Sequence, residues 1–177
     1  ITELKDLCIE TDLVKDGQAH VTIVAPASGT YDAQASAIAA AIQKLTGVRA
    51  PIAKDDSPEA AVPSEYNLIL LGNRSTNETI SRLYNWYYTL LDLRYPGPGG
   101  HLVRTLHNPL GDGNNVVFVG GSDDAGVQAA TQVFIDNLNG GKAGRGGLTI
   151  GWIAEIKLGE GVEVPTDVRE LEIWEAS

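Results

Sequence analysis

The residues with the clearest potential for chemistry lie in the turn Gly120–Asp124, read GGSDD, which follows the apolar run Val116–Val119. A turn that opens a helix presents free backbone N–H groups and a partial positive charge, and this combination binds phosphate. Here the carboxylates of Asp123 and Asp124 occupy that place and would repel an anion, while Ser122 has the side chain of an N-cap residue. We therefore interpret the turn as a helix cap.

A second turn, Asn73-Arg74, follows the apolar run Asn67–Leu71. In parallel sheets the carboxyl ends of the strands share one edge, where α/β proteins usually bind ligands. An alternative interpretation is therefore a small-ligand or nucleotide site at that edge, formed by Asn73, Arg74, Ser122 and Asp123. The chain lacks the pattern G-x-x-x-x-G-K-[ST] and has no G-x-G-x-x-G between a strand and a helix, so no cofactor is predicted.

The spacing of the histidine, cysteine and acidic residues gives little support for a metal site or for nucleophilic catalysis. His101 and His107 share one face of a regular strand but lie roughly 20 Å apart at about 3.3 Å per residue, too far for one ion. His20 has no neighbouring ligand in the sequence, and Cys8 is the only cysteine. No G-x-S-x-G elbow is present, and spacing singles out no catalytic pair among the 23 acidic residues. We predict no metal site and no catalytic residue, and the role of Cys8 stays open.

Aromatic residues are concentrated in Arg82–Tyr95, which holds four of the six tyrosines and one of the three tryptophans. On a helix through this segment, Tyr87 falls on the inner face, whereas Trp86 and Tyr88 point away from it. Exposed apolar patches usually mark interfaces. We expect Trp86 and Tyr88 to contact a neighbouring domain, with stacking on a sugar as the alternative.

Composition restricts the class of partner. The 177 residues suffice for one ordinary domain. With a net charge of -10 and a pI of about 4.6, the chain would repel nucleic acid and anionic lipid at long range. Its apolar runs are too short to cross a bilayer, which requires about 20 residues. The chain starts at Ile1 and contains no methionine, which indicates a processed or excised segment of a secreted parent protein.

Apolar periodicity predicts an α/β or α+β fold. Strands are expected at Ala19–Ala25, Asn67–Leu71, His101–His107, Val116–Val119 and near Thr149–Leu158. Helices are expected over Tyr31–Thr46, from Thr76 or Asn77 to just before Pro96, and from the Gly120–Asp124 turn to Leu138. Parallel crossovers and a hairpin of the third and fourth strands give a mixed sheet with about three helices packed on it.

The same periodicity defines the domain boundaries. The polar segment Asp55–Ser64 is expected to be a surface connection. Residues 1–158 form a single α/β domain in this interpretation. Residues 159–177 form a linker or the start of a following domain that is absent from this chain, because a new helix pattern begins at Pro165 and has too few residues to pack.

Four stretches carry a family resemblance. These are ASAIAAAIQKLTGVRAPI (Ala35–Ile52), YNLILLGN (Tyr66–Asn73), GGHLVRTL (Gly99–Leu106) and the strand–turn–helix stretch Asn115–Leu138. Together they resemble the α/β domain that precedes the catalytic barrel in β-N-acetylhexosaminidases, α-glucuronidases and related bacterial polysaccharide-degrading enzymes. The resemblance implies a domain without catalytic residues of its own, since the catalytic acid pair belongs to the barrel.

The sequence therefore predicts a non-catalytic accessory domain of a secreted carbohydrate-active enzyme, either a glycoside hydrolase or a polysaccharide lyase. Its partner would be the rest of its own parent chain, with polysaccharide as a second partner, and its location extracellular or periplasmic. A stand-alone carbohydrate-binding module is one alternative. The small-ligand or nucleotide-binding domain described above is the other. No turnover is expected from this chain alone.

Overall fold

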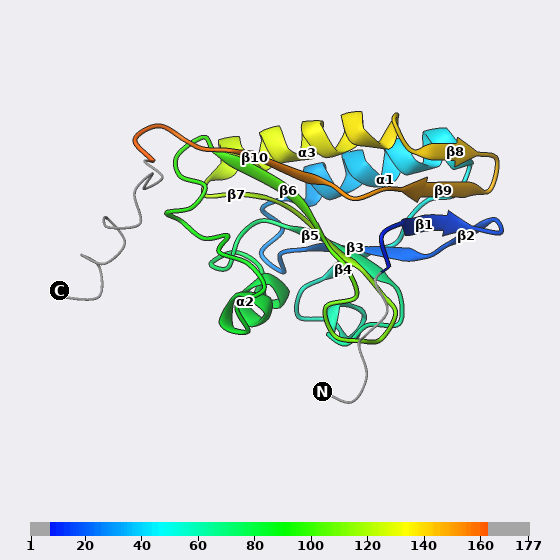
Figure 1. The fold of residues 1–177 in the computed structure, drawn as a ribbon, viewed down its shortest axis with the longest axis horizontal. Coiled ribbons are helices and arrows are strands. Elements are labelled where there is room, and N and C mark those ends of the chain that lie inside the picture. The colour runs from blue at the N-terminus through cyan, green and yellow to red at the C-terminus, as the bar shows by residue number, and fades with distance from the viewer. Residues whose placement is uncertain (1–7, 163–177) are drawn as a thin grey trace.

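A mixed sheet forms the centre of the fold (Figure 1). The computed structural model describes residues 8–162, and within them this sheet has six strands in the order β10-β6-β7-β5-β3-β4. Neighbours in the run β7-β5-β3-β4 are parallel, and β6 pairs antiparallel with both β7 and β10. The strands are β3 (Val21–Ala25), β4 (Ile52–Lys54), β5 (Asn67–Leu71), β6 (His101–Leu106), β7 (Val116–Gly121) and β10 (Ala154–Lys157).

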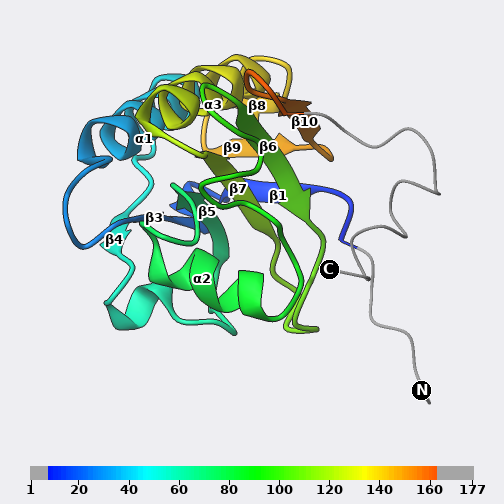
Figure 2. The ribbon, with the colours of Figure 1, turned by 90° about the vertical axis from the view of Figure 1, so that its left-hand side faces the viewer.

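Helices cover both faces of this sheet. Figures 1 and 2 show α1 (Asp32–Thr46) and α3 (Asp124–Leu138) side by side on one face and α2 (Glu78–Asn85) on the other. A short 3-10 turn, η1 (Pro58–Ala60), lies near the edge formed by β4. Each face buries its own apolar cluster, because parallel strands covered on both sides are apolar throughout. The predicted fold class, a mixed sheet with three helices packed on it, is confirmed.

A second, smaller sheet was not predicted. Within the described part of the chain it has four strands in the order β2-β1-β9-β8, all antiparallel. Leu13 and Val14 of β1 are fully buried, as is Leu148 of β9. The sheet therefore extends the larger apolar cluster. Its strands are β1 (Thr11–Lys15), β2 (Gln18–Ala19), β8 (Lys142–Gly144) and β9 (Gly147–Ile150).

Two predicted strands are each divided between the sheets. The expected strand Ala19–Ala25 is interrupted at His20, where β2 ends and β3 begins. The expected strand near Thr149–Leu158 is split at residues 151–153, so that β9 joins the small sheet and β10 the large one. In both places the chain crosses from one sheet to the other, a change that apolar periodicity does not encode.

The predicted second helix is too long. Asn77 caps α2 by accepting from Ile80 N at 3.2 Å, as the sequence suggested, but the helix ends at Asn85 instead of running to Pro96. Tyr87 has a φ of 62°, which reverses the chain, and Tyr88 N donates to Leu83 O at 3.0 Å across the helix end. A left-handed residue of this kind closes a helix.

The last described residues lie against the loop before β6. Gly159 N donates to Pro96 O at 2.8 Å, and Glu160 N donates to Pro98 O at 3.2 Å. Most of the predicted linker 159–177, including the helix pattern expected from Pro165, lies outside the described residues. The single domain over 1–158 followed by a linker stays a prediction. No helix among residues 8–162 is long and apolar enough to span a membrane.

Candidate functional site

The turns after β5 and β7 meet at the carboxyl edge of the large sheet. Asn73 is 1 % exposed, and its Nδ2 donates to Gly121 O at 3.0 Å. Its Oδ1 accepts from Ser75 N at 2.9 Å, which forms the turn after β5. Both the nitrogen and the oxygen of the Asn73 side-chain amide therefore hydrogen-bond to backbone groups. The structure does bring Asn73 and Ser122 to the same edge, because β5 and β7 are parallel neighbours.

Ser122 and Asp123 hold the loop that precedes β6. Ser122 Oγ accepts from Gly97 N at 2.8 Å, and Asp123 Oδ2 accepts from Gly99 N at 2.8 Å. The other carboxylate oxygen, Oδ1, accepts from Gly126 N at 2.8 Å. Asp123 is thus the N-cap of α3, so the assignment of that role to Ser122 is wrong. The serine hydroxyl binds the neighbouring loop instead.

Arg74 contacts an aromatic ring on α2. Its guanidinium carbon lies 4.3 Å from the centroid of Tyr84, a cation–π geometry. Its backbone N donates to Leu91 O at 3.1 Å. Of the four residues proposed for a ligand site, the edge therefore gathers Asn73, Ser122 and Asp123, while the Arg74 guanidinium stacks on Tyr84.

Two further polar residues lie at this edge that were not proposed for a ligand site from the sequence. Asp55, after β4, accepts from Ala27 N and from Glu78 N, both at 2.7 Å. Asn77 Nδ2 donates to Val24 O at 3.3 Å and Leu71 O at 3.0 Å. Asp55 is only 8 % exposed, so the expectation of a surface connection is wrong at its first residue. The sequence feature that could have identified Asp55 is a short polar residue directly after a strand.

Tyr31 joins the loop before α1 to the first turn of α3. Its hydroxyl donates to Asp124 Oδ1 at 2.9 Å. Burial raises the pKa of Tyr31 to about 12, and the hydrogen bond to Asp124 and the charges of Asp124 and Asp123 add to the effect. The phenol stays protonated at neutral pH and acts as a hydrogen-bond donor between two elements.

Glycines allow backbone segments to pack closely on one another at the edge. A Cβ built on Gly120 would lie 2.1 Å from Gly72 O, and one on Gly121 would lie 2.5 Å from Gly126 C. Real Cβ atoms do not approach other atoms this closely. The glycines that resemble a phosphate-binding turn in the sequence therefore allow backbone to pack on backbone. A hollow of about 900 Å³ lies elsewhere, along β4 and residues 56–66.

The histidines and the cysteine form no metal site in the described part of the chain. Among residues 8–162 no three His, Cys, Asp or Glu side chains gather as metal ligands would. His107 Nδ1 lies 2.6 Å from Cys8 O, whereas Cys8 Sγ lies 3.6 Å from Gly113 O. His101 is buried, and burial lowers the pKa of its imidazole. The free thiol of Cys8 is half-buried.

The sequence contains two N-glycosylation triplets, Asn73-Arg74-Ser75 and Asn77-Glu78-Thr79. Both asparagines are 1 % exposed and both side-chain amide nitrogens donate to buried backbone carbonyls. A glycan attached at either nitrogen would have to break these bonds. The folded domain is therefore not a glycosylation substrate at these positions.

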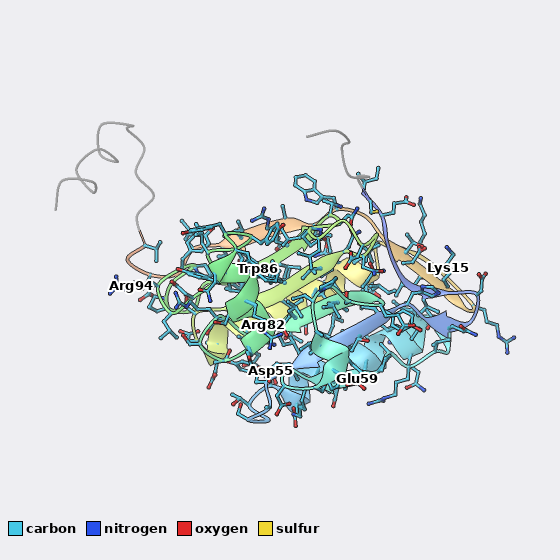
Figure 3. The ribbon with its side chains drawn as sticks, turned by 90° about the horizontal axis from the view of Figure 1, so that it is seen from below. Lys15, Asp55, Glu59, Arg82, Trp86 and Arg94 are labelled. Carbon is cyan, nitrogen blue, oxygen red and sulfur yellow. The ribbon has the colours of Figure 1, made fainter. Side chains whose placement is uncertain are left out.

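The segment after α2 exposes large apolar side chains. Trp86 is 50 % exposed, Tyr87 92 %, Leu90 63 % and Leu93 61 %, and we call these four residues the 86–93 surface. Figure 3 shows Trp86 on the underside of the molecule, on the same side as Arg82 and Arg94. Tyr88 is half-buried and its hydroxyl donates to Pro109 O at 2.7 Å. The predicted orientations of Tyr87 and Tyr88 are therefore wrong, because the helix ends before them.

In the described part of the chain, the polar side chains of Asn73, Ser122 and Asp123 at the carboxyl edge thus bind neighbouring backbone groups. Residues 6–138, three quarters of the chain, match the family model described as the outer domain of an S-layer-like family. The chain belongs to this family. No curated protein matches the chain.

Family membership corrects the functional predictions made from the sequence. The resemblance to the domain preceding the barrel of β-N-acetylhexosaminidases and α-glucuronidases is wrong, as is the predicted role in polysaccharide degradation. The carbohydrate-binding and nucleotide-binding alternatives are not supported either. The resemblance rested on apolar runs and glycines, which many α/β folds share because burial on both faces of a sheet requires them. An S-layer-like family indicates a location at the cell surface or outside the cell.

Proposed function

We propose that this chain is a structural domain of a cell-surface protein layer, and that it acts by presenting surfaces to neighbouring protein. The observation that carries the proposal is the match of residues 6–138 to the outer domain of an S-layer-like family. The commitment of Asn73, Ser122 and Asp123 to internal hydrogen bonds supports it, because it leaves these polar groups to hold the fold. We place the domain on the extracellular side of the envelope.

The 86–93 surface is the contact that we assign to the rest of the parent chain. Tyr87 occupies the left-handed position that ends a helix, where glycine is the favoured residue. A side chain in this conformation costs about 1 kcal/mol or more relative to glycine. A ring that is 92 % exposed gains little in return within this chain. Burial of the Tyr87 ring against a neighbouring domain would offset this steric cost. The same contact would also cover Trp86.

The path of the chain supports a neighbour at this place. A Cβ on Gly97 would lie only 2.1 Å from Cγ2 of Val162, so the chain at residue 162 lies beside the 94–97 loop. That loop follows Leu93 directly. If the parent chain continues into another domain, that domain is tethered from a point beside the 94–97 loop, and a tether raises its effective concentration near the 86–93 surface.

The test is a pair of substitutions in the complete parent protein in its own organism. Trp86→Ser with Leu93→Ser should leave this domain folded, since both side chains are exposed, but should weaken the surface layer or release the protein from the envelope. Ile9→Ser, which alters another residue that is 59 % exposed, serves as the control. Electron microscopy of isolated envelopes gives the readout. A parent protein located inside the cell would refute the proposal, and an unchanged layer would refute the assignment of the 86–93 surface.

A further inference from the structure

The strand β10 forms one edge of the large sheet. It pairs with β6 on one side, and Figure 2 shows it beyond β6 at the rim of the sheet. All four of its residues are exposed. Among residues 8–162 no strand pairs with its other side. An uncovered edge offers a row of unpaired backbone donors and acceptors to another chain.

The register identifies which backbone groups face outward. Thr105 N donates to Ile153 O at 2.9 Å, so the antiparallel ladder continues through the pairs Glu155–Val103 and Lys157–His101. Antiparallel pairs alternate, and the N–H and C=O groups of the intervening residues therefore point away from β6. Ile156 presents both of its backbone groups to the free side of the edge.

The side chains of β10 are self-complementary. The sequence of the strand is Ala154-Glu155-Ile156-Lys157, with one acid and one base on either side of Ile156. If two copies of this strand run antiparallel about a two-fold axis through Ile156, each isoleucine forms a hydrogen-bonded pair with its equivalent. Glu155 of each copy then lies opposite Lys157 of the other, in the closer, non-hydrogen-bonded type of pair.

We propose that β10 binds β10 of a second copy of this chain in this register, joining two large sheets into one. The inference rests on the proposed function, because a layer requires contacts between repeated copies. The symmetric contact satisfies the outward backbone groups of Ile156 and forms two ion pairs between Glu155 and Lys157. It also places the exposed Ile156 side chains, each 46 % exposed alone, beside each other.

The opposite edge of the sheet is a poorer partner for β10. The strand β4 carries a single charged residue, Lys54. Its Nζ is already 2.5 Å from Asp32 Oδ1 and 3.2 Å from Pro26 O. Pairing of β10 with β4 would therefore leave at least one charge of Glu155 and Lys157 unmatched, whereas pairing with a second β10 matches both.

The contact is short and should be weak between two isolated copies. Four residues of edge strand bury much less than the roughly 1,200 Å² of a standard stable interface. In an array each copy is also held by other contacts, so the local concentration of a second β10 is high. The two-fold contact links copies in pairs, and other surfaces of the parent protein have to extend the array.

A disulfide trap tests the register. Ile156→Cys in a Cys8→Ser background of the 177-residue chain places two thiols on residues expected about 5.5 Å apart between Cα atoms, within the range for a disulfide. Mild oxidation at about 0.15 M salt, which limits repulsion between acidic copies, should give a covalent dimer. The control is Ala143→Cys in the same background, which is also an exposed position, on the edge strand β8 of the smaller sheet. Equal dimer yields from the two variants would overturn the proposal.

Charge reversal tests the proposed pairing independently. Glu155→Lys or Lys157→Glu in the Ile156→Cys background turns both cross-strand pairs repulsive, and should slow dimer formation about tenfold. The double exchange restores opposite charges and should restore the rate. A rate that follows only the net charge, with no recovery in the double exchange, would overturn the proposal. Neither result depends on the layer, so loss of the cell-surface role and failure of this contact are observed separately.

Discussion

Gly126, in the first turn of α3, lies directly against the carbonyl oxygen of Gly100. A Cβ built on Gly126 would be 2.2 Å from Gly100 O and 3.0 Å from Gly121 Cα. Gly100 is itself crowded, since a Cβ there would be 2.6 Å from Gly159 N and from Pro96 O. Three segments that are distant in the sequence, around residues 96–100, 121–126 and 159, therefore meet through their backbones where an α/β ligand would otherwise lie.

Gly126→Ala is expected to destabilise the domain. Alanine in place of glycine usually stabilises a helix by about 1 kcal/mol, but here the methyl group would overlap a fixed backbone carbonyl. We expect a net loss of about 1–3 kcal/mol, the usual effect of overpacking, measured by urea unfolding. Gly144→Ala is the control, because nothing lies within 4 Å of its Cβ position. A Gly126→Ala variant as stable as the original chain would contradict the close contact.

Asp123→Ala should destabilise α3 and release the loop before β6 together. Loss of an N-cap costs about 0.5–2 kcal/mol, and Gly99 N loses its acceptor as well, so we expect about 1–3 kcal/mol in the free energy of unfolding. Asp136→Ala, an exposed aspartate near the end of the same helix, should have little effect. Amide exchange of Gly99 and Gly126 gives a residue-specific measurement. Unchanged protection at Gly99 would show that Asp123 does not hold the loop.

Tyr31→Phe should reduce stability at neutral pH and lose that effect in alkali. The hydrogen bond to Asp124 contributes about 1 kcal/mol. The folded-state pKa of Tyr31, about 12, lies above the ordinary value of 10.0. The stabilisation is therefore complete below pH 10 and declines as the pH rises from 10 to about 12. The measurement is the difference in unfolding free energy between the two chains as a function of pH. A difference that stays constant through this window would contradict the assignment.

Tyr87→Gly should stabilise the isolated chain while weakening its assembly. Glycine adopts the φ of 62° without the steric cost that tyrosine bears, and we expect a gain of up to about 1 kcal/mol after the entropic cost of glycine. Thermal unfolding measures the first effect, and retention of the parent protein in isolated envelopes measures the second. Tyr87→Val, with a branched side chain in the same conformation, should be less stable than the original. Loss of stability in the glycine variant would show that the ring packs within this chain.

The elements with strong periodicity were predictable from the sequence. The helix Asp32–Thr46 ends at Gly47, whose φ of 81° matches the predicted left-handed cap. The strand Asn67–Leu71 has the predicted bounds. The hairpin of β6 and β7 also agrees with the prediction. In each case a local rule, either apolar spacing or a glycine cap, coincides with what the whole fold requires.

The errors arise where tertiary structure decides. Nothing in the local pattern of Thr11–Lys15 reveals that its partner strand lies more than 130 residues further on, in β9. The helical spacing after Asn85 continues in the sequence, but Tyr87 reverses the chain. The carboxyl-edge residues could be placed together from topology. The side chains of Ser122 and Asp123 bind backbone groups of the loop 96–100. The sequence did not predict the position of this loop, so it could not show that these side chains have no need of a ligand.

The pairing of β1 with β9 has a consequence for biosynthesis. Leu13 and Val14 are synthesised more than 130 residues before the strand that pairs with theirs, which begins at Gly147. A nascent chain that stops at Leu138, where the family match ends, lacks this strand and also leaves β6 without β10. Such a chain would carry exposed apolar strands and be prone to aggregate during synthesis. The unit that folds is therefore longer than the unit by which the family is recognised.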